Sequence, residues 1–292
     1  SPGTNMGSNA LNALPLDLDG NPRVQNTVID LGAYESTSNL LGGPFVTSPN
    51  DAGANTLRQA ILDINASPGC YVWPLVIDAT AATGNILLAS SLPAPAFPVT
   101  VEGPAAGSTL AVDGQGTQRL FAAFANATVS TTFNRLTFQN AFCNTAASRP
   151  NVFELTAGNL TLNACTLRNN LTTWTGVSNA IGAVYITAGA AFTANETVFD
   201  NCDIAAGSNG ARGGAIRSLN GTVVLNRCTF RNNNATAGTS PGTGGAIDNT
   251  GGTLTATNCL FYANGANSTS STAYGSAIRT TGTRKYIIAD AP

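Results

Sequence analysis

Residues 213–232 read GGAIRSLNGTVVLNRCTFRN, and residues 244–263 repeat the pattern as GGAIDNTGGTLTATNCLFYA. Two columns of apolar residues follow this period along the chain. The first, with steps of 29, 32, 31 and 31 residues, consists of Phe138, Leu167, Phe199, Phe230 and Phe261. The second, with steps of 32, 31 and 31 residues, consists of Val184, Ile216, Ile247 and Ile278. Two columns in phase with each other indicate a tandem repeat.

Each repeat is built from short segments in which apolar and polar residues alternate. Residues 221–230 and 252–259 place their apolar side chains on one face, which is typical of a half-buried strand. Clusters of Gly, Asn, Thr and Ser separate these segments, and helical periodicity is absent between Pro98 and Tyr286. Strands this short cannot bury a face alone. We therefore expect an all-β parallel solenoid, in which each coil (one complete turn) pairs with the next.

An asparagine follows the apolar anchor by two residues in four successive repeats: Asn140, Asn169, Asn201 and Asn232. Asparagine tolerates the left-handed backbone of a tight corner, and its amide can bond to an amide in the next coil. We expect these residues to form a ladder at one corner. The alternative is that they are ordinary turn residues.

Three cysteines occupy one column two residues before the anchor, namely Cys165, Cys228 and Cys259, with Thr197 in the remaining repeat. A catalytic or metal-binding role requires an accessible, polarised thiolate. We instead expect small buried side chains stacked inward.

Composition excludes several classes of protein. The 292 residues contain no histidine, which excludes a Ser-His-Asp triad and histidine-ligated zinc. Thirteen Lys and Arg against fifteen Asp and Glu give a net charge of −2, which disfavours a nucleic-acid partner. No apolar run reaches the roughly twenty residues of a membrane helix, so we expect no membrane insertion. We also expect no cofactor.

The chain divides into a short N-terminal region and a β-helix over residues 51–292. The β-helix begins with an amphipathic helix at residues 51–65, in which Thr56 is the N-cap and Gln59 completes a capping box. Its apolar face consists of Leu57, Ala60, Ile61 and Ile64. We expect this helix to cover the open end of the solenoid. Irregular early coils follow at residues 85–131, and regular repeats at residues 132–290. Residues 36–50 are predicted to be a linker.

Residues 1–35 differ in sequence pattern from the repeats and contain a candidate calcium loop. Asp17, Asp19 and Asn21 are spaced like the first ligands of such a loop. However, Gly20 is misplaced, and Val28 stands where a bidentate glutamate is needed. The sequence therefore favours a structural turn and no metal.

Several motifs resemble those of bacterial surface proteins. Residues 56–61 (TLRQAI) are similar to the CSLREAI motif that opens many bacterial surface β-helices. The GGAI elements and the Phe-x-x-Asn elements at residues 230–233 and 261–264 resemble polymorphic outer membrane protein repeats. Residues 14–35 resemble the closing segment of such modules. This resemblance, which covers most of the chain, implies a right-handed parallel β-helix on a secreted or cell-surface protein.

The order of these segments is unusual, because the closing segment precedes the opening motif. We expect the chain to be one period of a longer tandem protein or fibre, with residues 1–35 completing the preceding module. That module lies in the same chain or in a neighbouring subunit. The alternative is an arbitrary boundary.

Parallel β-helices also include enzymes that cleave polysaccharides, which need paired carboxylates or a calcium cluster with a nearby cation. The only closely spaced acids in the repeats are Asp200 and Asp203, and the candidate cations are Arg212, Arg217 and Arg279. Acids in a turn are usually solvated surface groups, so we expect no catalytic residues.

Sparse charge and faces of Thr, Asn and Ser favour close lateral packing or contact with carbohydrate. We therefore expect a non-catalytic, extracellular structural or adhesive module of a cell-surface appendage or filament. Its partners would be neighbouring modules of the same protein, joined head to tail, and cell-surface glycans. The alternative is a β-helix that binds or cleaves polysaccharides.

Overall fold

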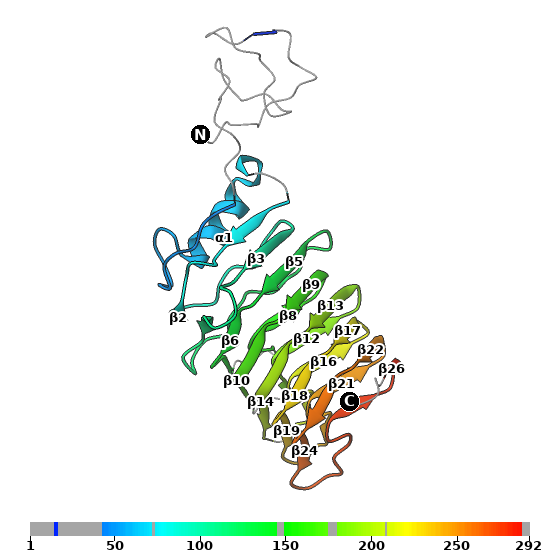
Figure 1. The fold of residues 1–292 in the computed structure, drawn as a ribbon. Coiled ribbons are helices and arrows are strands. Elements are labelled where there is room, and N and C mark those ends of the chain that lie inside the picture. Colours follow the sequence, from blue (N-terminus) through cyan, green and yellow to red (C-terminus); the bar gives the residue numbers. More distant parts are fainter. Residues whose placement is uncertain are drawn as a thin grey trace.

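The computed structural model describes residues 15–16, 43–71, 74–144, 149–174, 180–207 and 209–287. Within these ranges, short parallel strands stack along one axis as a β-solenoid, with a helix near its N-terminal end (Figure 1). The predicted parallel β-helix is therefore confirmed. The calcium candidates Asp17, Asp19 and Asn21 lie outside the described residues.

Three long sheets form the faces of the solenoid, and a short fourth sheet flanks them. Sheet A contains β1 (Val76–Asp78), β3 (Val99–Glu102), β5 (Ser130–Asn134), β9 (Gly158–Asn163), β13 (Ala190–Asn195), β17 (Thr222–Asn226), β22 (Thr253–Thr257) and β26 (Thr283–Ile287). Sheet B contains β2 (Gly84–Leu87), β4 (Leu110–Asp113), β6 (Thr137–Gln139), β10 (Thr166–Trp174), β14 (Val198–Ala206), β18 (Thr229–Arg231) and β23 (Leu260–Tyr262), with β7 (Phe142–Cys143), β19 (Asn234–Ala237) and β24 (Gly265–Ser268) beside them.

Sheet C contains β8 (Phe153–Leu155), β12 (Val184–Thr187), β16 (Ile216–Leu219), β21 (Ile247–Thr250) and β25 (Ile278–Thr280). Sheet D, the short sheet, contains β11 (Ala180–Ile181), β15 (Ala211–Arg212) and β20 (Gly242–Thr243). The early strands β2, β3 and β4 pair in register with strands of the later coils. The coils predicted to be irregular at residues 85–131 therefore already belong to sheets A and B.

The period of the sequence places like residues on top of one another. Phe199 pairs with Leu167 and Phe230, and Phe230 pairs with Phe261. The rings of Phe199 and Phe230 stack with centroids 4.5 Å apart, and those of Phe230 and Phe261 with centroids 4.8 Å apart. The second column is also in register, from Val184 through Ile216 and Ile247 to Ile278. Most of these side chains are buried, and they form the core of the solenoid.

The GGAI glycines are required by the backbone. Gly213 and Gly244 have φ values of 65° and 59°, and a Cβ at either position would lie 2.0 Å from a backbone carbonyl oxygen. That oxygen belongs to Ile216 in one coil and to Ile247 in the next. A side chain could not be placed there without moving the backbone, so the glycines keep the turn into sheet C tight.

Helix α1 (Leu57–Ala66) covers the first coil and is followed by a 3-10 turn, η2 (Pro68–Cys70). The predicted apolar face of the helix is buried. The helix begins at Leu57 and not at Asp51, because Gly53 and Asn55 have left-handed φ values of 103° and 60°, which a right-handed helix excludes. The capping box is only half formed. The Thr56 hydroxyl accepts from the Gln59 N–H, but the Gln59 side chain donates to Asp63.

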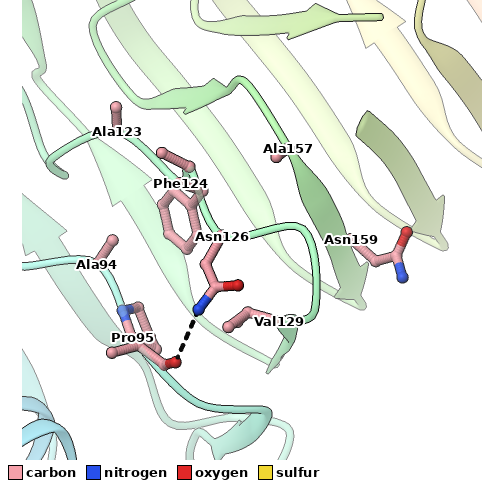
Figure 2. A pocket seen from close by; sticks show the side chains of 10 residues that line it. Ala94, Pro95, Ala123, Phe124, Asn126, Val129, Ala157 and Asn159 are labelled. Carbon is pink, nitrogen blue, oxygen red and sulfur yellow. Dashed lines mark hydrogen bonds between the residues drawn. The ribbon is translucent and has the colours of Figure 1, made fainter. Parts of the chain in front are cut away.

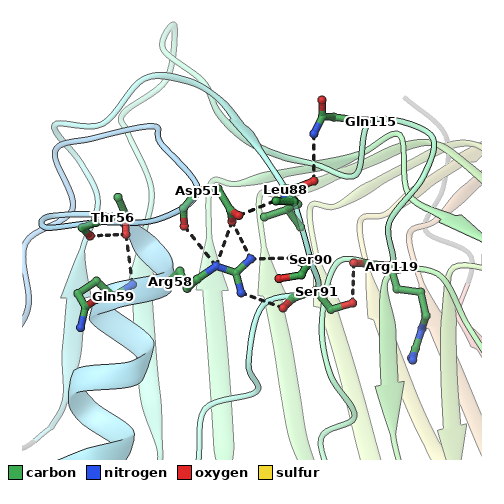
Figure 3. A network of polar contacts seen from close by, with 11 residues as sticks. Asp51, Thr56, Arg58, Gln59, Leu88, Ser90, Ser91, Gln115 and Arg119 are labelled. Atoms are coloured by element: carbon green, nitrogen blue, oxygen red, sulfur yellow. Dashed lines mark hydrogen bonds and ion pairs between the residues drawn. The ribbon is translucent and has the colours of Figure 1, made fainter.

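Asp51, placed in the helix by the sequence, instead fastens the helix to the solenoid (Figure 3). Its carboxylate accepts from Arg58 at 2.7 Å and from the Ala89 N–H at 3.1 Å. Arg58 also donates to the backbone oxygens of Ser90 and Ser91. The helix and the loop after β2 are therefore joined by one charged network.

Part of the predicted linker also belongs to this end of the fold. Phe45 forms a parallel bridge with Asp78, and the Val46 N–H donates to the Asp78 carbonyl at 2.7 Å. Val46 is fully buried against the helix and the first coil. Residues 43–46 thus extend sheet A beyond β1, with Val46 buried in the core and Phe45 64% exposed.

Candidate functional site

The closely spaced acids Asp200 and Asp203 do not form a paired site. Asp200 accepts from Arg231 at 2.7 Å and from Asn232 at 3.0 Å, whereas Asp203 accepts from the backbone and side chain of Asn234. Asn201, with a φ of 53°, turns the chain between the two acids. Each acid therefore has its own partner in the next coil.

Their pKa values move in opposite directions. Burial acts to raise the pKa of Asp200, but the hydrogen bonds from Arg231 and Asn232 outweigh it and lower the pKa. Burial raises the pKa of Asp203, and the hydrogen bonds from Asn234 oppose this only in part. Both shifts follow from contacts between stacked coils.

The three candidate arginines lie around a different carboxylate, that of Asp248 on β21. Asp248 is fully buried and accepts hydrogen bonds from the hydroxyls of Thr243 and Thr250. Arg279 lies 3.3 Å from each of its two oxygens, and Arg212 lies 3.8 Å from one of them. The Asp248 carboxylate is thus surrounded by donors.

Arg217 belongs to the same group but has a different contact. It is the register partner of Asp248 on one side and of Tyr185 on the other. Its guanidinium lies over the Tyr185 ring, 5.6 Å from the centroid, as in a cation–π contact. Burial lowers the pKa of Arg217, and the charges of Arg212 and Arg279 add to this, while Tyr185 and Asp248 oppose it in part.

These residues continue along one column of sheet C. The register runs from Glu154 through Tyr185, Arg217 and Asp248 to Arg279. At its first member, Glu154 accepts from two further arginines, Arg119 and Arg149, each at 2.9 Å. We call the set of Arg119, Arg149, Arg212, Arg217 and Arg279 the arginine row. The repeat aligns Arg217 and Arg279 with Asp248, whereas Arg212 comes from sheet D, and Arg119 and Arg149 come from loops.

The predicted corner asparagines all adopt left-handed backbone, with φ values of 51–57° at Asn140, Asn169, Asn201 and Asn232. Only Asn201 and Asn169 bond to each other, at 3.1 Å. Asn140 instead donates to Asp113, and Asn232 donates to Asp200. Carboxylates in neighbouring coils thus take the place of amides in part of this ladder.

A continuous amide ladder occurs at another corner, where the sequence analysis did not place one. It connects Asn134, Asn163, Asn195 and Asn226 at the ends of successive sheet A strands, with distances of 2.8, 2.7 and 2.8 Å. The signal was an asparagine two residues before Cys165, Thr197 and Cys228. Asn134 has the same position before Leu136, whereas Thr257 takes this position before Cys259. This ladder joins four coils along one edge.

The Phe-x-x-Asn motif has a structural role inside the solenoid. Its buried asparagine, Asn233, accepts from the Cys202 N–H at 3.0 Å and donates to the Phe199 carbonyl at 3.0 Å. Asn170 makes the same pair of bonds to Ala141 and Phe138. These amides satisfy backbone groups that the bend between β strands leaves without a ladder partner. Cys202 occupies this position in the intervening coil.

The cysteine column points inward. Cys165 and Cys228 are buried, Cys259 is partly exposed, and all three are free thiols. Burial raises the pKa of Cys165 and of Cys202 to about 12. The hydrogen bond with Cys259 raises the pKa of Cys228, and burial adds to this. The same bond lowers the pKa of Cys259 to about 7.

Iodoacetamide is expected to modify Cys259 in the native protein at pH 8, while Cys165, Cys202 and Cys228 react more than about 100-fold more slowly. The thiolate is the reacting form, so the Cys259 rate should rise as the pH passes about 7 and then level off. Peptide mapping by mass spectrometry measures each site. Equal labelling of Cys165 and Cys259 in folded protein would contradict the burial of this column.

Figure 2 shows a surface pocket of about 340 Å³ lined mainly by small apolar side chains. Asn126 donates across it to the Ala96 carbonyl at 3.4 Å. No acid or base is among its lining residues, so it offers no group for catalysis.

Across the described ranges, no group of three or more Cys, Asp or Glu side chains could hold a metal ion. In the same ranges, the helices are too short or too polar to cross a bilayer.

The C-terminal coil is less covered than the rest. Leu260, Tyr262 and Tyr274 are 56%, 43% and 52% exposed. Phe261 and Ile278 are partly buried, although their counterparts one coil earlier, Phe230 and Ile247, are fully buried. Among the described strands, β23, β24, β25 and β26 are the last in their sheets. Among the residues that the structure describes, this end therefore presents apolar side chains and strand edges without a described neighbour.

Comparisons with protein-family models, curated proteins and solved structures found no match.

Proposed function

We propose that the chain is a non-catalytic, extracellular structural or adhesive β-helix module that joins end to end with neighbouring modules or subunits. The observation that carries this proposal is the difference between the two ends of the solenoid. One end is covered by α1, whereas among the described residues the other end exposes Leu260, Tyr262 and Tyr274 beside the last strand of each sheet. Open edges of this kind pair with other chains unless they are covered.

Residues 1–35 of a neighbouring module are the proposed cover. They contain the apolar segment Val28-Ile29-Asp30-Leu31 and resemble the closing segment of surface β-helix modules. A contact between this segment and the last coil is heterologous, so it repeats without closing and generates a filament. The extracellular location rests on the same resemblance, to bacterial surface repeats.

The polar chemistry supports a non-catalytic role. Asp200 and Asp248 are engaged with arginines of neighbouring coils, and Asp203 is held by Asn234. Release of reducing sugars or unsaturated products from a polysaccharide panel, abolished by Asp200→Ala or Asp203→Ala, would overturn this part of the proposal.

The end-to-end contact is tested by comparing the full chain with a chain lacking residues 1–35. The full chain is expected to form oligomers that grow with concentration in sedimentation velocity, and rods of increasing length by electron microscopy. The shortened chain should remain monomeric, and a peptide of residues 1–35 should break the oligomers. The double substitution Leu260→Asp and Tyr262→Lys should have the same effect as the deletion, with an unchanged circular dichroism spectrum. A full chain that stays monomeric at all concentrations, or a shortened chain that still polymerises, would overturn the proposal.

A further inference from the structure

The arginine row concentrates positive charge in a chain that is acidic as a whole. It holds five of the thirteen Lys and Arg residues, whereas the net charge of the chain is −2. Among the described residues, two carboxylates, those of Glu154 and Asp248, pair with four of these five arginines. The row therefore keeps an excess of cations after all its ion pairs are counted.

The donors of the row are also only partly used. The two oxygens of Asp248 already accept from Thr243, Thr250 and Arg279, which leaves little capacity for more. Among the described residues, no carboxylate lies within ion-pair distance of Arg217. The Nε atoms of Arg212 and Arg217 are buried without a hydrogen-bond partner. These Nε atoms are enclosed and do not reach solvent, so an external anion would meet the outer parts of the guanidinium groups. The side chains of Arg212 and Arg279 are each 27% exposed. Partly exposed guanidinium groups with surplus charge are suited to an external anion.

The spacing of the row indicates the form of that anion. Glu154, Tyr185, Arg217, Asp248 and Arg279 stand on five adjacent strands, so the column is about 19 Å long at the usual strand spacing. Arg217 and Arg279 flank Asp248 and lie on strands about 10 Å apart. A linear polymer whose negative groups are well separated can place one negative group at each arginine. A neutral part of the polymer would then lie opposite Asp248.

We propose that the arginine row binds an acidic polysaccharide, in which carboxylates of the sugar units pair with Arg217, Arg212 and Arg279. Guanidinium forks bind carboxylates through two parallel hydrogen bonds, and several such pairs along one chain reinforce one another. Double-stranded nucleic acid is disfavoured, since it carries a charge about every 1.7 Å along its axis and would meet the two carboxylates and the acidic remainder of the protein. This site shares Arg279, on the last strand of sheet C, with the open end of the solenoid, but the proposal does not rest on end-to-end assembly.

The proposal is tested with polygalacturonate as the probe, using the full chain and isothermal titration calorimetry at low ionic strength. The native chain is expected to bind polygalacturonate but not neutral dextran, and the affinity should fall as salt is added. Arg217→Gln should lower the affinity at least about tenfold, because a charge-assisted pair is lost. Arg217→Lys keeps the charge but loses the fork of the guanidinium group. Its affinity for polygalacturonate should therefore lie between those of the native chain and of Arg217→Gln.

Arg227→Gln is the matched control. Arg227 is 63% exposed and pairs with Glu196 at the corner between sheets A and B, away from the row. This variant should bind polygalacturonate as the native chain does. Absence of binding by the native chain, or an equal loss in Arg217→Gln and Arg227→Gln, would overturn the proposal. Tighter binding of an oligothymidylate than of polygalacturonate would also overturn it and assign the row to nucleic acid. Because Arg217→Gln leaves the last coil unchanged, its effect is distinguishable from failure of end-to-end assembly.

Discussion

Replacing Phe230 by alanine is expected to lower the free energy of unfolding by about 3–5 kcal/mol. Phe230 is fully buried between Phe199 and Phe261, and its ring is nearly parallel to both, at interplanar angles of 2° and 4°. Its removal opens a cavity and breaks two aromatic stacks. In a solenoid, contacts between neighbouring coils supply much of the stability, so one gap weakens two interfaces. Urea unfolding followed by circular dichroism measures the change.

Two further substitutions calibrate this result. Phe261→Ala should lower the free energy of unfolding less than Phe230→Ala does, because Phe261 is only partly buried and stacks on one ring. Leu260→Ala, at a position 56% exposed on the same strand as Phe261, should change the stability by no more than about 0.5 kcal/mol. If Phe230→Ala cost no more than Leu260→Ala, the aromatic column would not be a main element of the core.

The register of this column was predictable, because a fixed period in a solenoid places equivalent residues on adjacent strands. Phe199, Phe230 and Phe261 are paired in sheet B, and Ile216, Ile247 and Ile278 in sheet C. The helix face was predictable for a similar reason, since helical spacing alone selects the residues that are buried. Periodicity thus determined the fold class without any information on distant contacts.

The start of the helix could not be predicted in the same way. The N-cap Thr56 is a local signal for a start at Leu57, but the role of Asp51 is not local, because it bonds to Arg58 and to the Ala89 N–H of a segment 38 residues away. That contact depends on the position of the strand-to-strand loop. Likewise, an excess of asparagine obscured the difference between the corner residue Asn232 and the buried Asn233 that follows it.

Part of the arginine row follows from the repeat, because Arg217, Asp248 and Arg279 each come directly after a residue of the isoleucine column, but the contacts with sheet D do not. Arg212 and Thr243 belong to sheet D, whereas Asp248 belongs to sheet C, and the repeat contains no signal that brings these sheets together. The three arginines were recognised as candidate cations, but they were paired with Asp200 and Asp203 because those acids are close in sequence. The carboxylate that they surround is a single buried one in another strand.

Asp248→Ala is expected to lower the free energy of unfolding by about 3–5 kcal/mol, the range for removing one partner of a buried ion pair. Asp248 is fully buried, and its loss leaves Arg212 and Arg279 without their carboxylate beside the charge of Arg217. Thr243 and Thr250 also lose the acceptor for their hydroxyls. Urea unfolding of this variant, alongside native protein, measures the cost. Glu196→Ala is the control and should cost less than about 1 kcal/mol, because its pair with Arg227 is exposed.

The cause of this loss can be separated into charge and hydrogen bonding. Asp248→Asn retains an acceptor for the threonine hydroxyls but removes the negative charge, so it should recover only part of the stability lost in Asp248→Ala. Combining Asp248→Asn with Arg279→Gln removes one of the repelling cations, and the two effects should therefore be less than additive. A strictly additive double variant would mean that Arg279 and Asp248 do not interact, even though they lie 3.3 Å apart.

If Asp248→Ala were no more destabilising than Glu196→Ala, the Asp248 carboxylate would not hold the cations together. Arg212, Arg217 and Arg279 would then tolerate one another without an anion, which would remove the surplus of charge as an argument for an external ligand.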